Sequence, residues 1–198
     1  MKYDFIIVGS GIIGLALAYK LKKKFNNGKI LILEKEKDSI QHGSGRNSGV
    51  IHSGIYYEPG SLRATLGVQG GRELKEYIKS KRLWIDECGK ILVPTSQNSY
   101  ENTEQLFARG IENGVVIKKL SGEQIANLEP NINNKYNIGL HVPFTSIADP
   151  KEVSKSLIGD LIDLGVEIQY QEAVTKIEEE GCKIHTVNST YECVHSFN

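Results

Sequence analysis

"YDFIIVGSGIIG", residues 3–14, is the stretch that decides the fold. Its first half is a short run of mostly apolar, often branched side chains, which is typical of a strand buried on both faces. Three glycines follow in the spacing GxGxxG, at Gly9, Gly11 and Gly14, and the run after them, IIGLALAYKLKKKF, has helical character. The order of strand, glycine turn and helix predicts the first part of a βαβ unit.

The second strand of this unit is predicted in KILILE, which ends at Glu34, 20 residues after Gly14. In such a unit Gly9 permits the tight turn, Gly11 lets the backbone approach a pyrophosphate, and Gly14 lets the helix pack closely on the sheet. The helix N-terminus offers unpaired N–H groups to phosphates. Glu34 can accept hydrogen bonds from an adenosine ribose, and its charge would repel a 2′-phosphate. The pattern therefore predicts a dinucleotide site and disfavours NADP, but it leaves NAD and FAD open.

The segment GSGRNSGVIHSGIYYEPGS, Gly43 to Ser61, follows this unit and is rich in glycine and serine. Bare backbone and small hydroxyl groups suit close approach to a flat or extended ligand. A long helix is predicted directly afterwards, with Ser61 as its N-cap. The side chains able to donate to phosphate, ribityl or ring oxygens are Ser44, Arg46, Asn47 and Ser48.

The N-terminal unit and the run GRNSGVIHSGIYYEPGSL resemble the FAD-dependent oxidoreductases of the D-amino-acid-oxidase-like superfamily. Within that superfamily they are most similar to the L-2-hydroxyglutarate oxidase/dehydrogenase family. The resemblance continues through CGKILVPTS, LEPNI and EAVTKIE, so it covers essentially the whole chain. The run NSGVIHSGIYY is its most specific part, and it favours FAD as the cofactor.

The resemblance also implies which residues bind FAD. The glycine turn would hold the pyrophosphate, Glu34 the adenosine ribose, and Val174 the adenine edge through its backbone. The serine-bearing loop would run beside the pyrophosphate and the ribityl chain towards the isoalloxazine. The full set is Gly9, Ser10, Gly11, Ile12, Ile13, Gly14, Glu34, Lys35, Ser44, Gly45, Arg46, Asn47, Ser48, Val50, His52 and Val174.

His52 is the one candidate catalytic residue. An imidazole titrates near neutral pH, so His52 can serve as the base that takes a hydroxyl proton during hydride transfer. Two other interpretations stay open: a residue that lines the pocket or contacts the flavin, and a purely structural histidine. The remaining histidines lie apart without ligand spacing, and we expect no metal site.

The fold class expected is α/β: a Rossmann-like FAD-binding domain with an inserted α+β substrate-binding domain, truncated at the C-terminus. We expect residues 1–81 to form the first part of the FAD-binding domain, 82–147 a partial substrate-binding domain, and 148–198 the return segment of the FAD-binding domain. In similar proteins the chain continues after the position of Asn198 for roughly as long again. The chain by itself is therefore expected to lack flavin-ring contacts and to lose turnover.

The activity implied by the resemblance is oxidation of a 2-hydroxy acid, L-2-hydroxyglutarate to 2-oxoglutarate, by hydride transfer to flavin N5, with oxygen or a quinone as the electron acceptor. Two alternatives stay open. One is oxidation of an amine, an amino acid or glycerol 3-phosphate on the same fold, and the other is an FAD-binding fragment without catalysis.

Composition limits the other classes of partner. Lys plus Arg equals Asp plus Glu, 24 each, so a nucleic-acid partner has no electrostatic support. The three cysteines, at 88, 182 and 193, contain no CxxC pair, which favours a reducing compartment and argues against a disulfide framework and a zinc site. The apolar run from Phe5 to Ala18 is too short to span a bilayer. We expect a cytoplasmic protein, with peripheral attachment at the inner face of the membrane left open.

Overall fold

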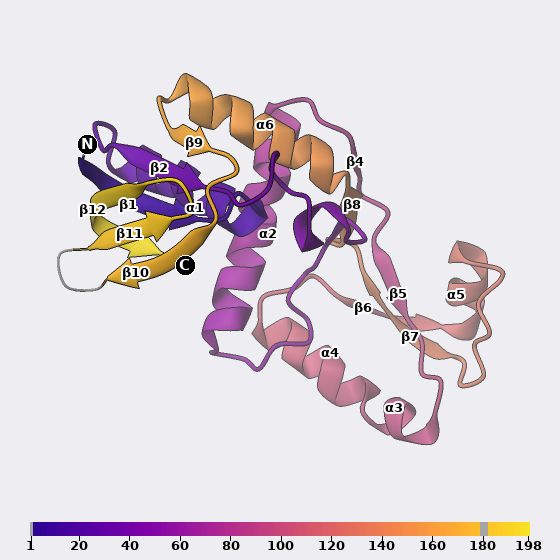
Figure 1. The fold of residues 1–198 in the computed structure, drawn as a ribbon. Coiled ribbons are helices and arrows are strands. Elements are labelled where there is room, and N and C mark those ends of the chain that lie inside the picture. The colour runs from indigo at the N-terminus through magenta and orange to yellow at the C-terminus, as the bar shows by residue number, and fades with distance from the viewer. Residues whose placement is uncertain (1, 179–181) are drawn as a thin grey trace. The chain divides into compact units, whose positions relative to one another are not determined.

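The computed structural model describes residues 2–178 and 182–198 and has two compact units. Unit 1 contains the chain up to Asn47 together with Pro150–Asn198, and unit 2 is Ser48–Asp149. Figure 1 shows helices and strands in both units, which confirms the predicted α/β class.

Unit 1 is built on a sheet that, in the described residues, has the strand order β10-β11-β12-β1-β2-β9. The second half of β1 is apolar, and β2 is apolar and buried along its whole length. Strand β1 pairs parallel with β12 on one side and with β2 on the other, and β9 pairs parallel with β2. Beyond β1, strands β12, β11 and β10 form an antiparallel meander. The strands are β1 Lys2–Val8, β2 Ile30–Leu33, β9 Glu167–Gln169, β10 Val174–Glu178, β11 Lys183–Thr186 and β12 Thr190–Phe197.

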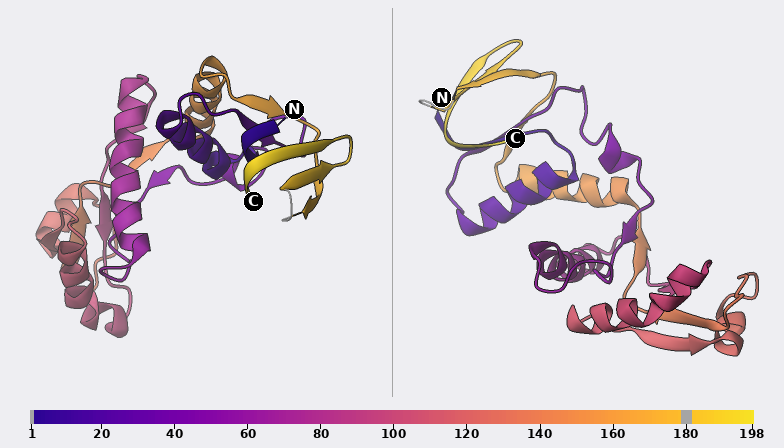
Figure 2. Two further views of the ribbon diagram at one scale, coloured as in Figure 1. Left: turned by 90° about the vertical axis from the view of Figure 1, so that its left-hand side faces the viewer. Right: turned by 90° about the horizontal axis from the view of Figure 1, so that it is seen from below.

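Two helices pack next to each other in unit 1, α1 (Ile12–Lys24) and α6 (Pro150–Asp163). Both lie on the same side of the sheet, as the right-hand view of Figure 2 shows. Leu15 of α1 and Leu161 of α6 are fully buried, so each helix contributes an apolar stripe to the core. The βαβ unit predicted from residues 3–34 is therefore confirmed.

Unit 2 contains two small antiparallel sheets in its described residues, β3-β8-β4 and β5-β7-β6. A core of Ile55, Val115, Ile117, Leu140 and Val142 holds the second sheet against the helices. The strands are β3 Val50–Ile51, β4 Ile85–Asp86, β5 Lys90–Leu92, β6 Lys118–Ser121, β7 Ile138–Val142 and β8 Ser146–Ala148. The α-helices are α2 Leu62–Ser80, α3 Gln97–Glu101, α4 Thr103–Glu112 and α5 Gly122–Leu128.

Helices α3 and α4 follow one another directly and meet at Asn102. The Thr103 hydroxyl donates to the Ser99 carbonyl at 2.9 Å, the acceptor that a continuous helix reserves for a backbone N–H. Such back-bonding bends helices.

The boundaries of the compact units differ from the segments predicted from the sequence. Helix α2 groups with unit 2, because Val68 packs against the unit 2 core and Lys75 contacts Phe144. The sequence places the first boundary after residue 81, whereas the compact units divide at Asn47 and Ser48. The assignment of flavin binding and substrate binding to separate segments stays a prediction.

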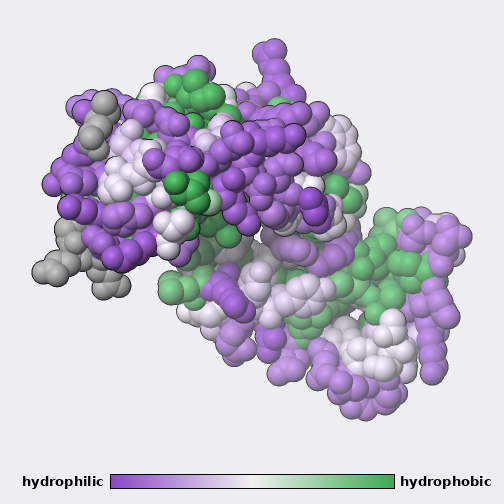
Figure 3. Space-filling view, in the orientation of Figure 1, coloured by the Kyte–Doolittle hydropathy of each residue, from purple (hydrophilic) through white to green (hydrophobic). Residues whose placement is uncertain are grey.

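Hydrophilic residues cover most of the face drawn in Figure 3, with hydrophobic ones scattered between them. In the ranges 2–178 and 182–198 no helix is long and apolar enough to cross a membrane. The same ranges contain no group of His, Cys, Asp and Glu side chains arranged to hold a metal ion.

Candidate functional site

The glycine turn has the geometry that the sequence predicts. Gly9 has a φ of +98°, which favours glycine, and its N–H donates to the Leu33 carbonyl at 2.8 Å. A Cβ added to Gly14 would lie 2.1 Å from the Gly9 carbonyl oxygen, so only glycine permits this close packing of the helix on the turn. One at Gly11 would lie 3.0 Å from the Ser44 hydroxyl. The bare backbone therefore forms a cradle that side chains would fill.

Helix α1 begins directly after Gly11 without a side-chain cap. Its first N–H, that of Ile12, donates to the Ser44 hydroxyl at 3.0 Å, which ties the serine-bearing loop to the helix N-terminus. Ile13 is 82% exposed on the first turn. The N-terminus of α1, the positive end of the helix dipole, therefore lies beside the serine-bearing loop. An anion site requires such a position.

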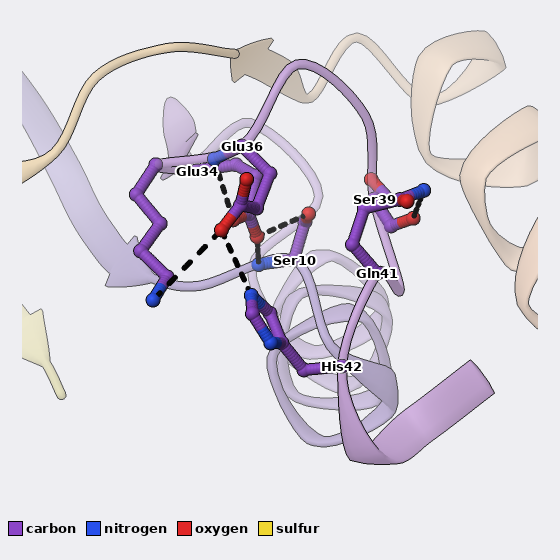
Figure 4. A network of polar contacts seen from close by, with 7 residues as sticks. Ser10, Glu34, Glu36, Ser39, Gln41 and His42 are labelled. Atoms are coloured by element: carbon purple, nitrogen blue, oxygen red, sulfur yellow. Dashed lines mark hydrogen bonds and ion pairs between the residues drawn. The ribbon is translucent and has the colours of Figure 1, made fainter. Parts of the chain in front are cut away.

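Glu34 lies at the end of β2, 7% exposed, and its two carboxylate oxygens have different partners. One accepts from the Ser10 N–H at 2.8 Å and from the Ser10 hydroxyl at 2.7 Å. The other accepts from the Glu36 N–H at 3.0 Å, as Figure 4 shows. Burial acts to raise the pKa of Glu34, but hydrogen bonds from the Ser10 side chain and from backbone N–H groups outweigh it and lower this pKa below its usual 4.5. The carboxylate is therefore held ionised beside the turn.

A cavity of about 340 Å³ opens at this end of the unit 1 sheet. It is lined by residues from four places: the glycine turn, the end of β2, the loop after it, and the chain that leads into β10. These residues are Val8, Gly9, Gly11, Leu33, Glu34, Lys35, Ile40, Gln41, His42, Ser44, Glu172, Ala173 and Val174. Open α/β sheets bind ligands at the carboxyl ends of their parallel strands, which is where this cavity lies.

The structure thus brings several predicted site residues together. Those that line the cavity are Gly9, Gly11, Glu34, Lys35, Ser44 and Val174. Three further predicted residues belong to the glycine turn but do not line the cavity: Ser10, Ile12 and Gly14. Gly45 and Arg46 line a neighbouring cavity of about 290 Å³ with Lys151 and Lys155, and the Asn47 amide donates to the carbonyls of Gly43 and Ser44.

Ser48, Val50 and His52 belong to unit 2. Val50 lies in β3, opposite Ile147 of β8, and His52 follows β3 with an exposed side chain. The roles predicted for these three residues in flavin binding, and for His52 in catalysis, stay predictions.

Several residues that line the cavity were not predicted from the sequence. His42 was assigned no chemistry, yet its Nε2 lies 2.9 Å from the Glu36 carboxylate at the cavity (Figure 4). Glu172 is buried and is held by the hydroxyl of Thr186 and the amide of Asn188. One signal was available, because His42 and Glu172 lie two residues before the predicted Ser44 and Val174. Their arrival at the cavity depends on long-range pairing, which the local pattern does not show.

The chain is similar to curated proteins that are named for one activity. It is 47% identical over 163 residues to the mitochondrial L-2-hydroxyglutarate dehydrogenase of Dictyostelium discoideum, covering 81% of this chain and 36% of that protein. It is 38% identical over 177 residues to the mitochondrial L-2-hydroxyglutarate dehydrogenase of Homo sapiens, covering 89% of this chain and 38% of that protein. The chain therefore spans less than half of the length of these relatives.

Solved structures agree on the fold. The L-alpha-glycerophosphate oxidase of Mycoplasma pneumoniae, solved with FAD bound, superposes with a TM-score of 0.87 at 31% identity, over 99% of this chain and 53% of that one. Glycine oxidase of Geobacillus kaustophilus superposes with a TM-score of 0.83 at 18% identity, over 98% of this chain and 54% of that one, and shows the fold alone. The family model described as "FAD dependent oxidoreductase" matches residues 4–196. With the glycine cradle, the ionised Glu34 and these matches, the chain belongs to the DAO family of FAD-dependent oxidoreductases.

Proposed function

We propose that the unit 1 cavity binds the adenosine diphosphate part of FAD, and that the protein oxidises L-2-hydroxyglutarate to 2-oxoglutarate. The observation that carries the first part is the cavity itself, where the glycine cradle, the ionised Glu34 and Val174 meet. The relatives named L-2-hydroxyglutarate dehydrogenase support the second part.

The residues present fit the cofactor. The absence of a side chain at Gly11 lets a pyrophosphate approach the N-terminus of α1, and the absence of one at Gly14 lets that helix pack on the turn. Glu34 has accepting capacity beyond its bonds to Ser10 and Glu36, since a carboxylate accepts about four hydrogen bonds, and ribose hydroxyls are suitable donors. Ala173 and Val174 present backbone and apolar side chains to an adenine.

When bound, the flavin supplies the acceptor for the two electrons of the hydride. The work of the protein is then to orient the substrate and to remove the hydroxyl proton. We assign that proton to His52 as base, because a neutral imidazole can accept it near pH 7. Dioxygen or a quinone is the terminal acceptor proposed, and peripheral contact with a membrane belongs to the quinone alternative.

Flavin titration of the purified chain tests the cofactor. We expect FAD and ADP to compete for one site and NAD to bind at least tenfold more weakly than FAD. Gly11→Val, which fills the cradle, should abolish binding, whereas Gly159→Ala should bind like the wild type because nothing lies within 4 Å of its added Cβ. Equal or tighter binding of NAD would contradict the proposal.

Anaerobic reduction tests the substrate. If the chain turns over, L-2-hydroxyglutarate should bleach the bound flavin, and glycine and glycerol 3-phosphate should not. Glycerol 3-phosphate is the most informative alternative substrate, because one similar solved structure, at 31% identity, is an L-alpha-glycerophosphate oxidase. A chain that binds FAD and is bleached by none of the three is a binding module only.

A further inference from the structure

Two cysteines of unit 1, Cys182 and Cys193, face each other across a hairpin. Strands β11 and β12 pair antiparallel with Lys183 opposite Glu192, which places Cys182 opposite Cys193. The Cys193 N–H donates to the Cys182 carbonyl at 3.1 Å, and the two Sγ atoms lie 2.8 Å apart. Both thiols are free in this structure. The pairing was not predicted from the sequence, because the two cysteines lie 11 positions apart on the two arms of a hairpin.

The separation of the two sulfur atoms suits a covalent bond. The Sγ atoms lie 2.8 Å apart, and a disulfide bond is about 2.05 Å long. The pair can therefore be joined across the strands with little movement of either one.

The two thiols differ in access. Cys193 is 3% exposed in a cluster with Tyr3, Leu33 and Ile184, whereas Cys182 is partly exposed at the rim of that cluster. Burial, together with the neighbouring Cys182, raises the pKa of the Cys193 thiol to about 12, so this group stays protonated. An oxidant in solution accordingly reaches Cys182 first.

We propose that Cys182 and Cys193 form a reversible dithiol–disulfide site that is oxidised by a hydroperoxide. In the first step the Cys182 sulfur attacks one oxygen of hydrogen peroxide and the O–O bond breaks. The departing hydroxide takes up the thiol proton of Cys182 and leaves as water, and Cys182 becomes a sulfenic acid. In the second step the Cys193 sulfur attacks the Cys182 sulfur. The S–OH bond breaks, and the hydroxide leaves as water with the thiol proton of Cys193. One hydrogen peroxide is consumed, two thiols become one disulfide, and two water molecules form.

The link would join β11 covalently to β12, the strand that pairs with β1. The surrounding cluster also contains Leu33 and Val174, which line the proposed nucleotide cavity. The proposal rests on the hairpin alone and not on flavin binding, so the two can fail separately.

Peptide mapping of the Cys88→Ser variant tests the site, because this change removes the exposed third thiol. Trypsin cleaves after Lys176 and Lys183, which puts Cys182 and Cys193 on separate peptides, 177–183 and 184–198. After stoichiometric hydrogen peroxide we expect the two peptides to be joined and the count of free thiols to fall from two to zero. Dithiothreitol should release both peptides and restore both thiols.

Two variants in the same background resolve the order of the steps. Cys193→Ser should leave a sulfenic acid on Cys182 that dimedone traps, whereas Cys182→Ser should leave Cys193 as a thiol. The oxidised Cys88→Ser chain should also unfold about 5–10 °C higher than its reduced form, because the link closes a loop in the unfolded chain. The proposal is overturned if peroxide leaves both thiols intact, or if Cys182 proceeds to the sulfinic acid while Cys193 stays free. Neither result needs a variant that alters the hairpin.

Discussion

Single glycines and one carboxylate determine the geometry of the site. Gly14 is fixed by a contact that no side chain permits, since its added Cβ would meet the Gly9 carbonyl at 2.1 Å. Glu34 is fixed by charge and hydrogen bonding, because Ser10 and Glu36 together satisfy both of its oxygens. The role of each residue follows from its immediate contacts, so both roles can be tested by single substitutions.

Gly14→Ala should destabilise unit 1 by about 3 kcal/mol or more, because the turn or the helix must move to remove the overlap. Gly159→Ala is the matched control: it lies within α6 of the same unit and has open space around its added Cβ. There we expect stabilisation of about 0.5–1 kcal/mol from the higher helix propensity of alanine. Urea denaturation followed by far-UV circular dichroism measures both. Similar losses for the two variants would contradict the packing role of Gly14.

Ser10→Ala should cost about 1–2 kcal/mol at pH 7, because the Glu34 carboxylate loses its hydroxyl donor. The sign of the pH dependence follows from the pKa of Glu34, which is lower in the folded chain than the usual 4.5. The stabilisation is complete above pH 4.5 and is lost as the pH falls through the folded-state pKa. The difference between wild type and Ser10→Ala should therefore shrink in acid. A difference that stays constant from pH 7 to pH 3 would show that the hydroxyl does not act through the carboxylate.

Helices in this chain depend on caps as well as on their apolar faces. Ser61 accepts a hydrogen bond from the Ala64 N–H at 3.2 Å, which confirms the predicted N-cap of α2. Ser96 and Ser121 form capping boxes at α3 and α5. Such local signals can be recognised in a sequence, as the predicted cap at Ser61 shows.

Ser61→Ala should destabilise unit 2 by about 1 kcal/mol through the loss of this cap, and Ser61→Asn should restore most of the stability. The fluorescence of Trp84, which is the single tryptophan of the chain and lies in unit 2, reports the urea midpoint. If Ser61→Asn were no more stable than Ser61→Ala, the hydroxyl would matter for a reason other than capping.

Charge is balanced over the whole molecule, but the carboxylates that matter for stability are few. Glu34 in unit 1 and Glu87 in unit 2 both titrate below their usual range. Hydrogen bonds from Lys75 and Lys79 lower the pKa of Glu87 to about 2, and the partly buried Lys75 also contacts the Phe144 ring at 4.2 Å. Each unit therefore contains its own acid-sensitive contact.

Both units should lose stability between about pH 4.5 and pH 2. The unfolded chain has the ordinary carboxylate pKa of 4.5, so on acidification it binds protons before the folded chain does. Circular dichroism follows both units, and Trp84 fluorescence follows unit 2. Lys75→Met should reduce the acid loss in unit 2, whereas Lys118→Met on the exposed part of β6 should leave it unchanged. If Lys75→Met and the wild type lost equal stability on acidification, the Glu87 contact would be excluded as the source of that loss.

The sequence by itself determined the βαβ unit, the glycine turn, the place of Glu34 at the end of β2, and the family. These features are local: each depends on residue types within a few turns of chain, where backbone geometry and apolar spacing leave few alternatives. Only the tertiary structure decided that Glu172 joins the predicted Val174 at the cavity, and that Cys182 faces Cys193. Those contacts follow from strand pairing and register between distant segments, and a one-residue shift of register would move each side chain to the opposite face of the sheet.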